Sequence, residues 1–239
     1  MTDPSRTPAA PLLDNVLAEL GQDIVSGTLA EGQTFTLQDL SDRFDISRTV
    51  AREAMRALEQ LGLVSSSRRV GITVRPRSSW AVFDQSVIDW RLACPKDRTP
   101  QLQSLNELRT GIEPLAARLA ARNATPEQRK ELITLASQVR ELGESGAGNT
   151  QDFLETDSRF HNLLLEASGN EMFAALAPPM LSVLHARTRY GMQPADLAPA
   201  AMSAHEELAR LIADGDEDAA EDQSRRLLTE VAQMFIDEE

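Results

Sequence analysis

The chain has 239 residues, of which 41% are hydrophobic and 4% aromatic, and it carries a formal net charge of -13 at pH 7. This length and composition predict a soluble, mainly helical protein with two domains, and the acidic balance argues against a general binder of polyanions. The sequence has no run of about 18 apolar residues, and the polar, proline-rich residues 1–11 contain no apolar signal core. We therefore expect a disordered tail over 1–11, no membrane segment and a location in the cytoplasm.

Two helices are predicted before residue 45. Apolar residues recur at helical spacing over 15–26, which predicts an amphipathic helix that packs beneath the elements that follow. A second, shorter amphipathic helix is predicted over 37–44, and the tight link formed by Asp45 and Ile46 joins it to the next segment. Two short helices joined by such a turn predict a helix-turn-helix.

The segment 47–63, SRTVAREAMRALEQLGL, predicts the third helix. Ser47 is a suitable N-terminal cap, and Arg48, Arg52 and Arg56 follow at intervals of four residues. Residues four apart lie on the same face of a helix, so the three guanidinium groups form a row. An arginine fork can bridge two acceptors on a guanine edge or clamp a phosphate, which predicts a DNA-reading helix. The alternative is a solvated helix face without a ligand.

A two-stranded wing is predicted after the third helix. The segments 64–67 and 72–74 are rich in small or β-branched residues, and the turn between them contains Arg68, Arg69 and Gly71.

The local charge of this region differs from that of the chain. Residues 46–77 contain seven arginines and two glutamates, a local charge of +5. A basic head on an acidic body is expected to bind DNA only where the head fits, because the body repels phosphate.

The remainder of the chain reads as helices. A short linker at 75–79 separates a winged helix-turn-helix domain, residues 12–77, from an all-α helical bundle, residues 78–239. The fold class is therefore mainly α. Helices are expected over 80–92, 102–122, 126–143, 151–167, 171–190, 202–214 and 216–237. The single cysteine, Cys94, cannot form an internal disulfide.

A possible metal site lies in the helical part. Asp157 and His161 are four residues apart, the spacing with which one helix offers two ligands to one metal ion. His205, on a later predicted helix, could supply a third ligand for a divalent ion of the zinc type. His185 is the remaining histidine, and its spacing does not decide whether it joins them.

The order helix, GTLAEGQTF, helix, SRTVAREAMRALEQLGLV and wing resembles the GntR family of bacterial transcription regulators. The helical remainder resembles the FadR-type subfamily with its FCD effector domain, so the resemblance covers nearly the whole chain. It implies that Arg48, Thr49 and Arg52 contact a palindromic operator, and that the wing tip with Gly71 enters the minor groove. One departure is Gln38, which stands where the family often has an arginine; Gln38 can hydrogen-bond a base but brings no charge.

The resemblance also implies a metal-binding effector domain. The family pattern has an aspartate and a histidine four apart, a histidine on a later helix and a further histidine on the last helix. The first three match Asp157, His161 and His205, whereas the fourth position falls on Leu227. Three protein ligands would bind a divalent ion less tightly, and open positions could accept water or a carboxylate effector.

An arginine that meets the effector carboxylate is also implied, and the matching residue is Arg109. The alternative for Arg109 is an ion pair with Glu113, four residues later. Arg187 and Tyr190 are further candidates for effector contacts, although a cation near a helix C-terminus is also stabilising without a ligand.

These patterns predict a homodimeric transcription regulator and not an enzyme. We expect it to repress by binding operator DNA and to be released by a small carboxylate, such as the sugar acids gluconate or galactonate. A metal-responsive regulator is one alternative. A metal-dependent hydrolase is another, and the absence of HExxH and GxSxG motifs disfavours it.

Overall fold

A computed structural model describes residues 9–196 and 199–233, with side chains described over 12–196 and 203–229. The chain divides into two compact units, Met1–Gln101 and Leu102–Glu239. Residues 1–8 of the expected tail lie outside the described residues, and the first helix already begins at Ala9. Within the described part of the chain, no helix is both long and apolar enough to cross a membrane.

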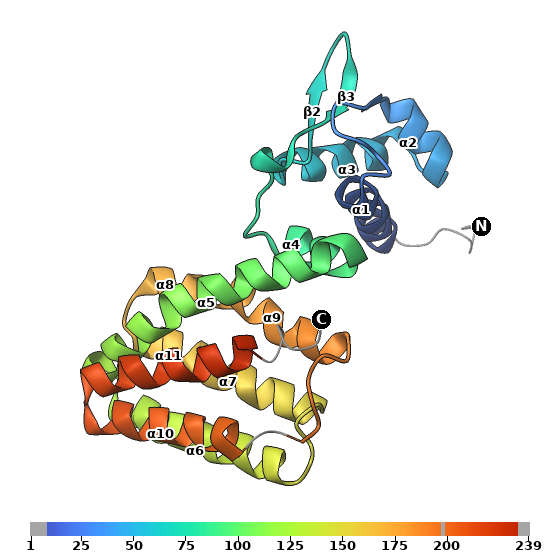
Figure 1. Cartoon of the computed structure of the whole chain (residues 1–239). Coiled ribbons are helices and arrows are strands. Elements are labelled where there is room, and N and C mark those ends of the chain that lie inside the picture. Colours follow the sequence, from blue (N-terminus) through green and yellow to red (C-terminus); the bar gives the residue numbers. More distant parts are fainter. Residues whose placement is uncertain (1–8, 197–198, 234–239) are drawn as a thin grey trace, which may run out of the picture. The chain divides into compact units, whose positions relative to one another are not determined.

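Unit 1 is a small helical domain with one antiparallel sheet (Figure 1). Its elements are α1 (Ala9–Ser26), β1 (Thr34–Phe35), α2 (Leu37–Phe44), α3 (Arg48–Gln60), β2 (Val64–Ser67), β3 (Gly71–Val74), a 3-10 turn (Arg77–Ser79) and α4 (Gln85–Ala93). Ser47 caps α3 by accepting a hydrogen bond from the backbone N–H of Val50 at 3.3 Å. Asp45 adopts the left-handed conformation at φ 49°, which makes the turn between α2 and α3 tight. The predicted helix-turn-helix is therefore present.

The sheet has the strand order β1-β3-β2, so the wing hairpin of β2 and β3 carries a third strand. The sequence did not predict β1, because two residues are too few to show an alternating pattern. Gly71 begins β3 with φ 95°, and a Cβ there would lie 2.8 Å from the carbonyl oxygen of Phe35. Glycine at this position thus allows β1 to approach the wing.

The core of unit 1 joins α1, α3, the sheet and α4. Leu20, Leu58 and Leu63 are fully buried in it. Trp90 of α4 lies directly over Gly21 of α1, since a Cβ on Gly21 would meet the indole ring at 2.5 Å. By packing, α4 thus belongs to unit 1, whereas the sequence places the domain boundary before it, after residue 77.

Unit 2 is a bundle of helices (Figure 1). In chain order the helices are α5 (Pro95–Asn123, which begins before the unit boundary), α6 (Pro126–Glu144), α7 (Gln151–Ala167), α8 (Glu171–Ala175), α9 (Ala177–Arg189), α10 (Pro199–Asp214) and α11 (Glu217–Gln233). Helix α10 packs against both α6 and α11, and α7 packs against α6 and α9. Phe160, Leu164 and Leu208 are fully buried between them.

Four helices differ clearly from the prediction. Helix α1 begins at Ala9 rather than at residue 15, and α4 begins at Gln85 rather than at residue 80. The single helix expected over 171–190 is interrupted after Ala175. Pro178 and Pro179 have no backbone N–H to continue the hydrogen bonds of the preceding helix, and they occupy the first turn of α9 instead. Helix α5 begins at Pro95 rather than at residue 102, since proline is favoured at the first position of a helix. The end of the last predicted helix, residues 234–237, lies outside the described residues.

Candidate functional site

A groove in unit 1 lies between α2, α3 and the wing and has a volume of about 640 Å³. These elements lie side by side in Figure 1. Its lining residues are Thr36, Leu37, Gln38, Arg48, Arg52, Met55, Ser66, Ser67, Arg68, Gly71 and Ile72. The structure therefore brings together five residues that the sequence singled out, including three arginines and Gln38.

Gln38 contacts the first arginine of α3. A guanidinium NH2 group of Arg48 donates a hydrogen bond to Oε1 of Gln38 at 2.8 Å, and Nε2 of Gln38 donates to Oδ1 of Asp42 at 2.7 Å. This chain of bonds holds the guanidinium at the edge of α2. The other N–H groups of Arg48, together with Arg52, remain at the groove, where a phosphate or a base edge could accept them.

Three predicted residues are exposed but do not line the groove: Thr49, Arg56 and Arg69. Arg56 forms an ion pair with Glu53 at 3.1 Å, so the row of three arginines divides into two at the groove and one beside it. The sequence did not single out Met55, which lines the groove one turn after Arg52. Only its helical spacing from that arginine could have indicated it.

Unit 2 contains a buried cluster of Asp157, His161 and His205. One ligand atom from each lies within 4.8 Å of the others. Nε2 of His205 is 3.1 Å from Oδ1 of Asp157, and Nε2 of His161 is 3.5 Å from the same oxygen. Phe160 packs edge-on against both imidazoles, with ring centroids 5.5 Å and 5.0 Å away. Helices α7 and α10 thus bring together Asp157 and His161, predicted from their spacing, and His205, predicted as a possible third ligand.

Arg109 and Glu113 extend this cluster from α5. They form a buried ion pair, and Oε2 of Glu113 lies 2.8 Å from Nδ1 of His161. The predicted ion pair of Arg109 with Glu113 is therefore present, and it is compatible with a role of Arg109 in effector binding because the pair is itself part of the buried cluster. From the sequence, Glu113 was predicted only as an ion-pair partner of Arg109. Its place one helical turn after Arg109, on the same face of α5, was the feature that could have indicated a role in the cluster.

The buried charges act on one another. Burial raises the pKa of Glu113, but Arg109 and His161 outweigh this effect and lower that pKa to about 2. Burial also opposes the charged form of Asp157, yet His161 and His205 hold the pKa of Asp157 well below its usual range. For His161, burial lowers the pKa, whereas Glu113 and Asp157 raise it more, so the net shift is upward.

The other effector candidates fall into different places. Arg187 of α9 is buried, and desolvation lowers its pKa to about 10 although the charge of Asp157 opposes the shift. Tyr190 caps the C-terminal end of α9, where Arg189 lies over its ring at 5.7 Å.

His185 is exposed, unlike His161 and His205. Leu227, at the position of the fourth family ligand, is 2% exposed within the apolar core of α11 and its neighbours.

The cluster fits a metal ion by its donor set and by its hydrogen bonding. Oδ1 of Asp157 and both ring nitrogens of His205 are buried and make no aligned hydrogen bond with any described residue. Buried polar atoms normally have partners, so these atoms, beside Nε2 of His161, indicate a ligand that would satisfy some of them. The donor set is one that zinc-type ions accept.

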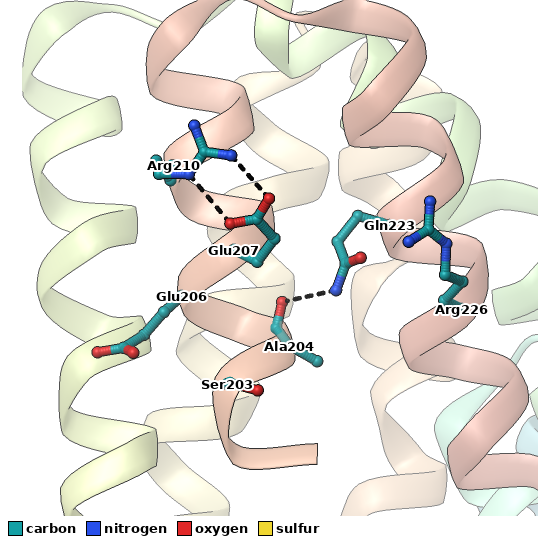
Figure 2. A pocket seen from close by; sticks show the side chains of 7 residues that line it. All are labelled: Ser203, Ala204, Glu206, Glu207, Arg210, Gln223 and Arg226. Carbon is teal, nitrogen blue, oxygen red and sulfur yellow. Dashed lines mark hydrogen bonds and ion pairs between the residues drawn. The ribbon is translucent and has the colours of Figure 1, made fainter. Parts of the chain in front are cut away.

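A further hollow, of about 580 Å³, lies on the surface between α10 and α11 (Figure 2). Figure 2 shows Glu207 and Arg210 paired on α10, while Gln223 of α11 donates a hydrogen bond to the carbonyl of Ala204 at 3.3 Å. Most of the side chains that line it are exposed, and its two glutamates are already paired with arginines. It lacks the convergence of buried groups found around His205, on the same helix α10.

Comparison with protein families matches both parts of the chain. Residues 12–74 match the model "Bacterial regulatory proteins, gntR family", and residues 104–230 match the FCD domain. The two matches together account for most of the chain, and the FCD match alone covers more than half of it. The expectation of a GntR regulator with an FCD domain is confirmed.

Curated relatives are transcription regulators. The galactonate operon transcriptional repressor of Escherichia coli K12 is 32% identical over 216 residues, covering 87% of this chain and 90% of that protein. The HTH-type regulator YieP of the same organism is 31% identical over 175 residues, 72% of this chain and 75% of that one. The repressor NanR of Klebsiella aerogenes is 31% identical over 178 residues, 72% of this chain and 65% of NanR.

Solved structures share the fold. Lar, which controls the expression of the Listeria monocytogenes agr system, has a TM-score of 0.58 at 15% identity, covering 97% of this chain and 98% of that one. A GntR protein of Streptococcus agalactiae has a TM-score of 0.50 at 21% identity, covering 92% and 99%. With these matches over both units, the chain belongs to the GntR family of bacterial regulatory proteins and is a DNA-binding transcription regulator with an FCD effector domain.

Proposed function

We propose that the protein is a homodimeric repressor that binds a palindromic operator through the groove of unit 1 and is released by a small carboxylate bound in unit 2. The groove carries the DNA-binding part of this proposal, because Gln38, Arg48, Arg52 and Arg68 line one hollow between the reading helix and the wing. One such head reads one half-site, and a two-fold dimer reads a palindrome. A regulator of this kind works beside the bacterial chromosome, in the cytoplasm.

The groove residues have separate tasks in this proposal. Arg48 and Arg52 read base edges or clamp phosphates, with Thr49 and Arg56 beside them on α3. The wing residues Arg68, Arg69 and Gly71 approach the minor groove.

Asp157, His161 and His205 hold one divalent ion in the proposed effector site. The ion would supply a Lewis-acid anchor for an oxygen of the effector. Glu113, 2.8 Å from Nδ1 of His161, favours a proton on that nitrogen and leaves Nε2 for the ion. Because Leu227 offers no ligand atom, the ion would keep open positions for the effector.

The charge balance of the cluster supports an anionic effector. The two carboxylates of Glu113 and Asp157 balance the two buried guanidiniums of Arg109 and Arg187. With a divalent ion added, the site would hold uncompensated positive charge in a region away from water, which is costly unless an anion enters. A small organic acid meets this requirement, with Arg109 and Arg187 as partners and Tyr190 at the end of α9.

A sugar acid is the effector that we favour, and galactonate is the first candidate. The 32% identity with the galactonate operon transcriptional repressor extends over 87% of this chain and so includes the effector domain. Release from DNA requires that the acid bind more tightly to the conformation with low operator affinity. Coupling of this kind usually amounts to about 1–3 kcal/mol.

A regulator that responds to the metal ion itself is the second candidate. The three ligand atoms within 4.8 Å of one another favour it. It gives the buried positive charges of Arg109 and Arg187 no part in binding the signal, and a site with three protein ligands is a weak one for sensing.

Fluorescence anisotropy on DNA from the protein's own upstream region tests the proposal. The full-length protein is titrated with galactonate, gluconate and unrelated small carboxylates, with zinc or with a chelator present. Release by a sugar acid that is lost with the chelator supports the proposal. Release by zinc alone supports the second candidate, and binding no tighter than to a scrambled duplex contradicts both.

A further inference from the structure

One face of α5 in unit 2 carries a row of apolar residues that the chain covers only in part. Leu115 is 43% exposed, Gly111 is exposed, and Leu108, Ile112 and Leu119 are half-buried. Leu108, Gly111 and Leu115 follow one another at intervals of three and four, and Ile112 and Leu119 are seven apart. On a helix these intervals place all five on one side, over three turns. We call this set the α5 seam.

The α5 seam differs from scattered surface residues. Ile133 of α6 is 45% exposed, as much as Leu115. Three of its four neighbours at helical spacing, at positions 129, 130 and 137, are polar, and the fourth, Ala136, is buried in the core. Single exposed apolar residues of that kind are ordinary in a folded protein. A continuous seam at intervals of three and four residues is the pattern by which a helix packs against a similar helix.

Gly111 adds a reason for close approach. A Cβ built on Gly111 would meet no described atom within 4 Å beyond its chain neighbours and the backbone of its own helical turn, so the space beside the middle of the seam is open there. Glycine is unfavourable inside a helix, and it leaves the α5 backbone accessible where a second helix could come near.

We propose that the α5 seam packs against the α5 seam of a second copy of this chain, with the two helices antiparallel about a two-fold axis near Ile112. This inference rests on the proposed dimeric function and names its interface. A self-complementary seam fits a second copy, because a two-fold axis sets the same surface patch against itself.

Charges beside the seam favour the antiparallel direction. Glu107 is exposed before the seam begins, and Arg118 and Arg122 lie near its end. In an antiparallel pair, Glu107 of each copy lies near Arg118 of the other, whereas a parallel pair sets like charges together. Arg118 and Arg122 are already ion-paired with acidic residues at the start of α11. Glu107 of the second copy would therefore join an existing network, and it would fix the antiparallel orientation of the two helices more than it would strengthen the dimer.

The seam also connects the dimer to the effector site. Arg109 and Glu113 are buried and project from another side of the same helix. A ligand that binds the Arg109 guanidinium acts on α5 directly. A small shift of α5 then changes how the two seams pack. Packed interfaces pass between discrete arrangements, which could alter the spacing of two DNA-binding heads.

Sedimentation velocity of the full-length protein tests the interface with the matched variants Leu115→Glu and Ile133→Glu. The two residues are equally exposed, so each variant places a carboxylate on the surface of the isolated chain at similar cost. Leu115→Glu buries two carboxylates in the interface, and we expect the dimer Kd to rise roughly 100-fold or more. Ile133→Glu leaves the wild-type dimer unchanged. A Leu115→Glu protein as dimeric as the wild type overturns the inference, and so does dissociation of both variants alike.

Gly111→Arg provides a second variant in case Leu115→Glu folds poorly. The open space at Gly111 accommodates a side chain in the single chain, and arginine favours the helix, so the helical signal in circular dichroism stays at the wild-type level. The bulky cation blocks the seam, and the protein sediments as a monomer; a persisting dimer contradicts the interface. These outcomes are independent of DNA. A wild-type dimer that dissociates on Leu115→Glu but never binds operator contradicts the proposed function alone, and a monomeric wild type contradicts the seam.

Discussion

Oε2 of Glu113 lies 2.8 Å from Nδ1 of His161, and the opposite nitrogen of that imidazole faces Oδ1 of Asp157 at 3.5 Å. A carboxylate behind a histidine fixes its tautomer and the direction of its free nitrogen. Helix α5 thereby orients a residue of α7, and the ion pair of Glu113 with Arg109 ties this orientation to the residue proposed to meet the effector.

Asp157→Asn is expected to remove metal binding with little change in shape. The amide keeps the volume of the carboxylate but loses the charge on the oxygen that faces both histidines. We expect zinc affinity, measured by equilibrium dialysis or calorimetry, to fall by ~10-fold or more. Operator affinity without effector stays at the wild-type value. Unchanged zinc affinity in Asp157→Asn would remove this residue from the ligand set.

Arg52→Ala is expected to weaken operator binding by about 1–3 kcal/mol, because it removes an arginine that lines the groove. Arg56→Ala is the matched control: it removes the same charge one turn away, from a side chain paired with Glu53 outside the groove. The anisotropy titration therefore shows a smaller loss for Arg56→Ala. Equal losses in both variants would mean that net charge matters and the groove geometry does not.

The acid dependence of stability is expected to change in Glu113→Gln. The pKa of Glu113 is lowered from 4.5 to about 2 in the folded protein, so its contribution to stability is fully present above pH 4.5 and is lost as the pH falls from 4.5 toward 2. The full effect is roughly 3 kcal/mol. Thermal melts in chelator should show a wild-type advantage that narrows between pH 5 and pH 3. A difference in melting temperature that stays constant over that range contradicts the assignment.

Gly21→Ala is expected to destabilise unit 1, although alanine favours a helix. The added methyl group would meet the ring of Trp90 at 2.5 Å, so α1 and α4 must separate or the indole must leave its place. Overpacking of this kind costs typically 1–3 kcal/mol, which exceeds the gain in helix propensity. Thermal denaturation followed by tryptophan fluorescence measures the loss. A melting temperature equal to or above that of the wild type would show that α4 is free to move away from α1.

Much of the fold could be predicted from local patterns. The capped helix after Ser47, the wing and most helices of unit 2 follow from periodicity and capping. Strand β1 could not be predicted, because its two residues depend on pairing with β3 across the sheet. Pro178 and Pro179 indicate the break before α9. The prediction missed this break because the apolar pattern continues through 171–190.

The candidate site was predictable where one helix carries it. The spacing of Asp157 and His161 indicated their shared direction, and His205 joins them only through the packing of α10 near α7. Glu113 was beyond prediction as a partner of His161, because that contact joins residues 48 positions apart on two helices. The groove likewise combines α2, α3 and the wing, so sequence order indicated its arginines but not Met55.

In the proposed function, an acid bound in unit 2 controls DNA binding by unit 1. The most direct measurement is an anisotropy titration of operator-bound protein with galactonate in the presence of zinc, for the wild type and for Asp157→Asn. We expect galactonate to release the wild type and to leave Asp157→Asn bound at the same concentrations. Release of both proteins at equal concentrations, or release of neither by any sugar acid, would contradict this control of DNA binding by the acid.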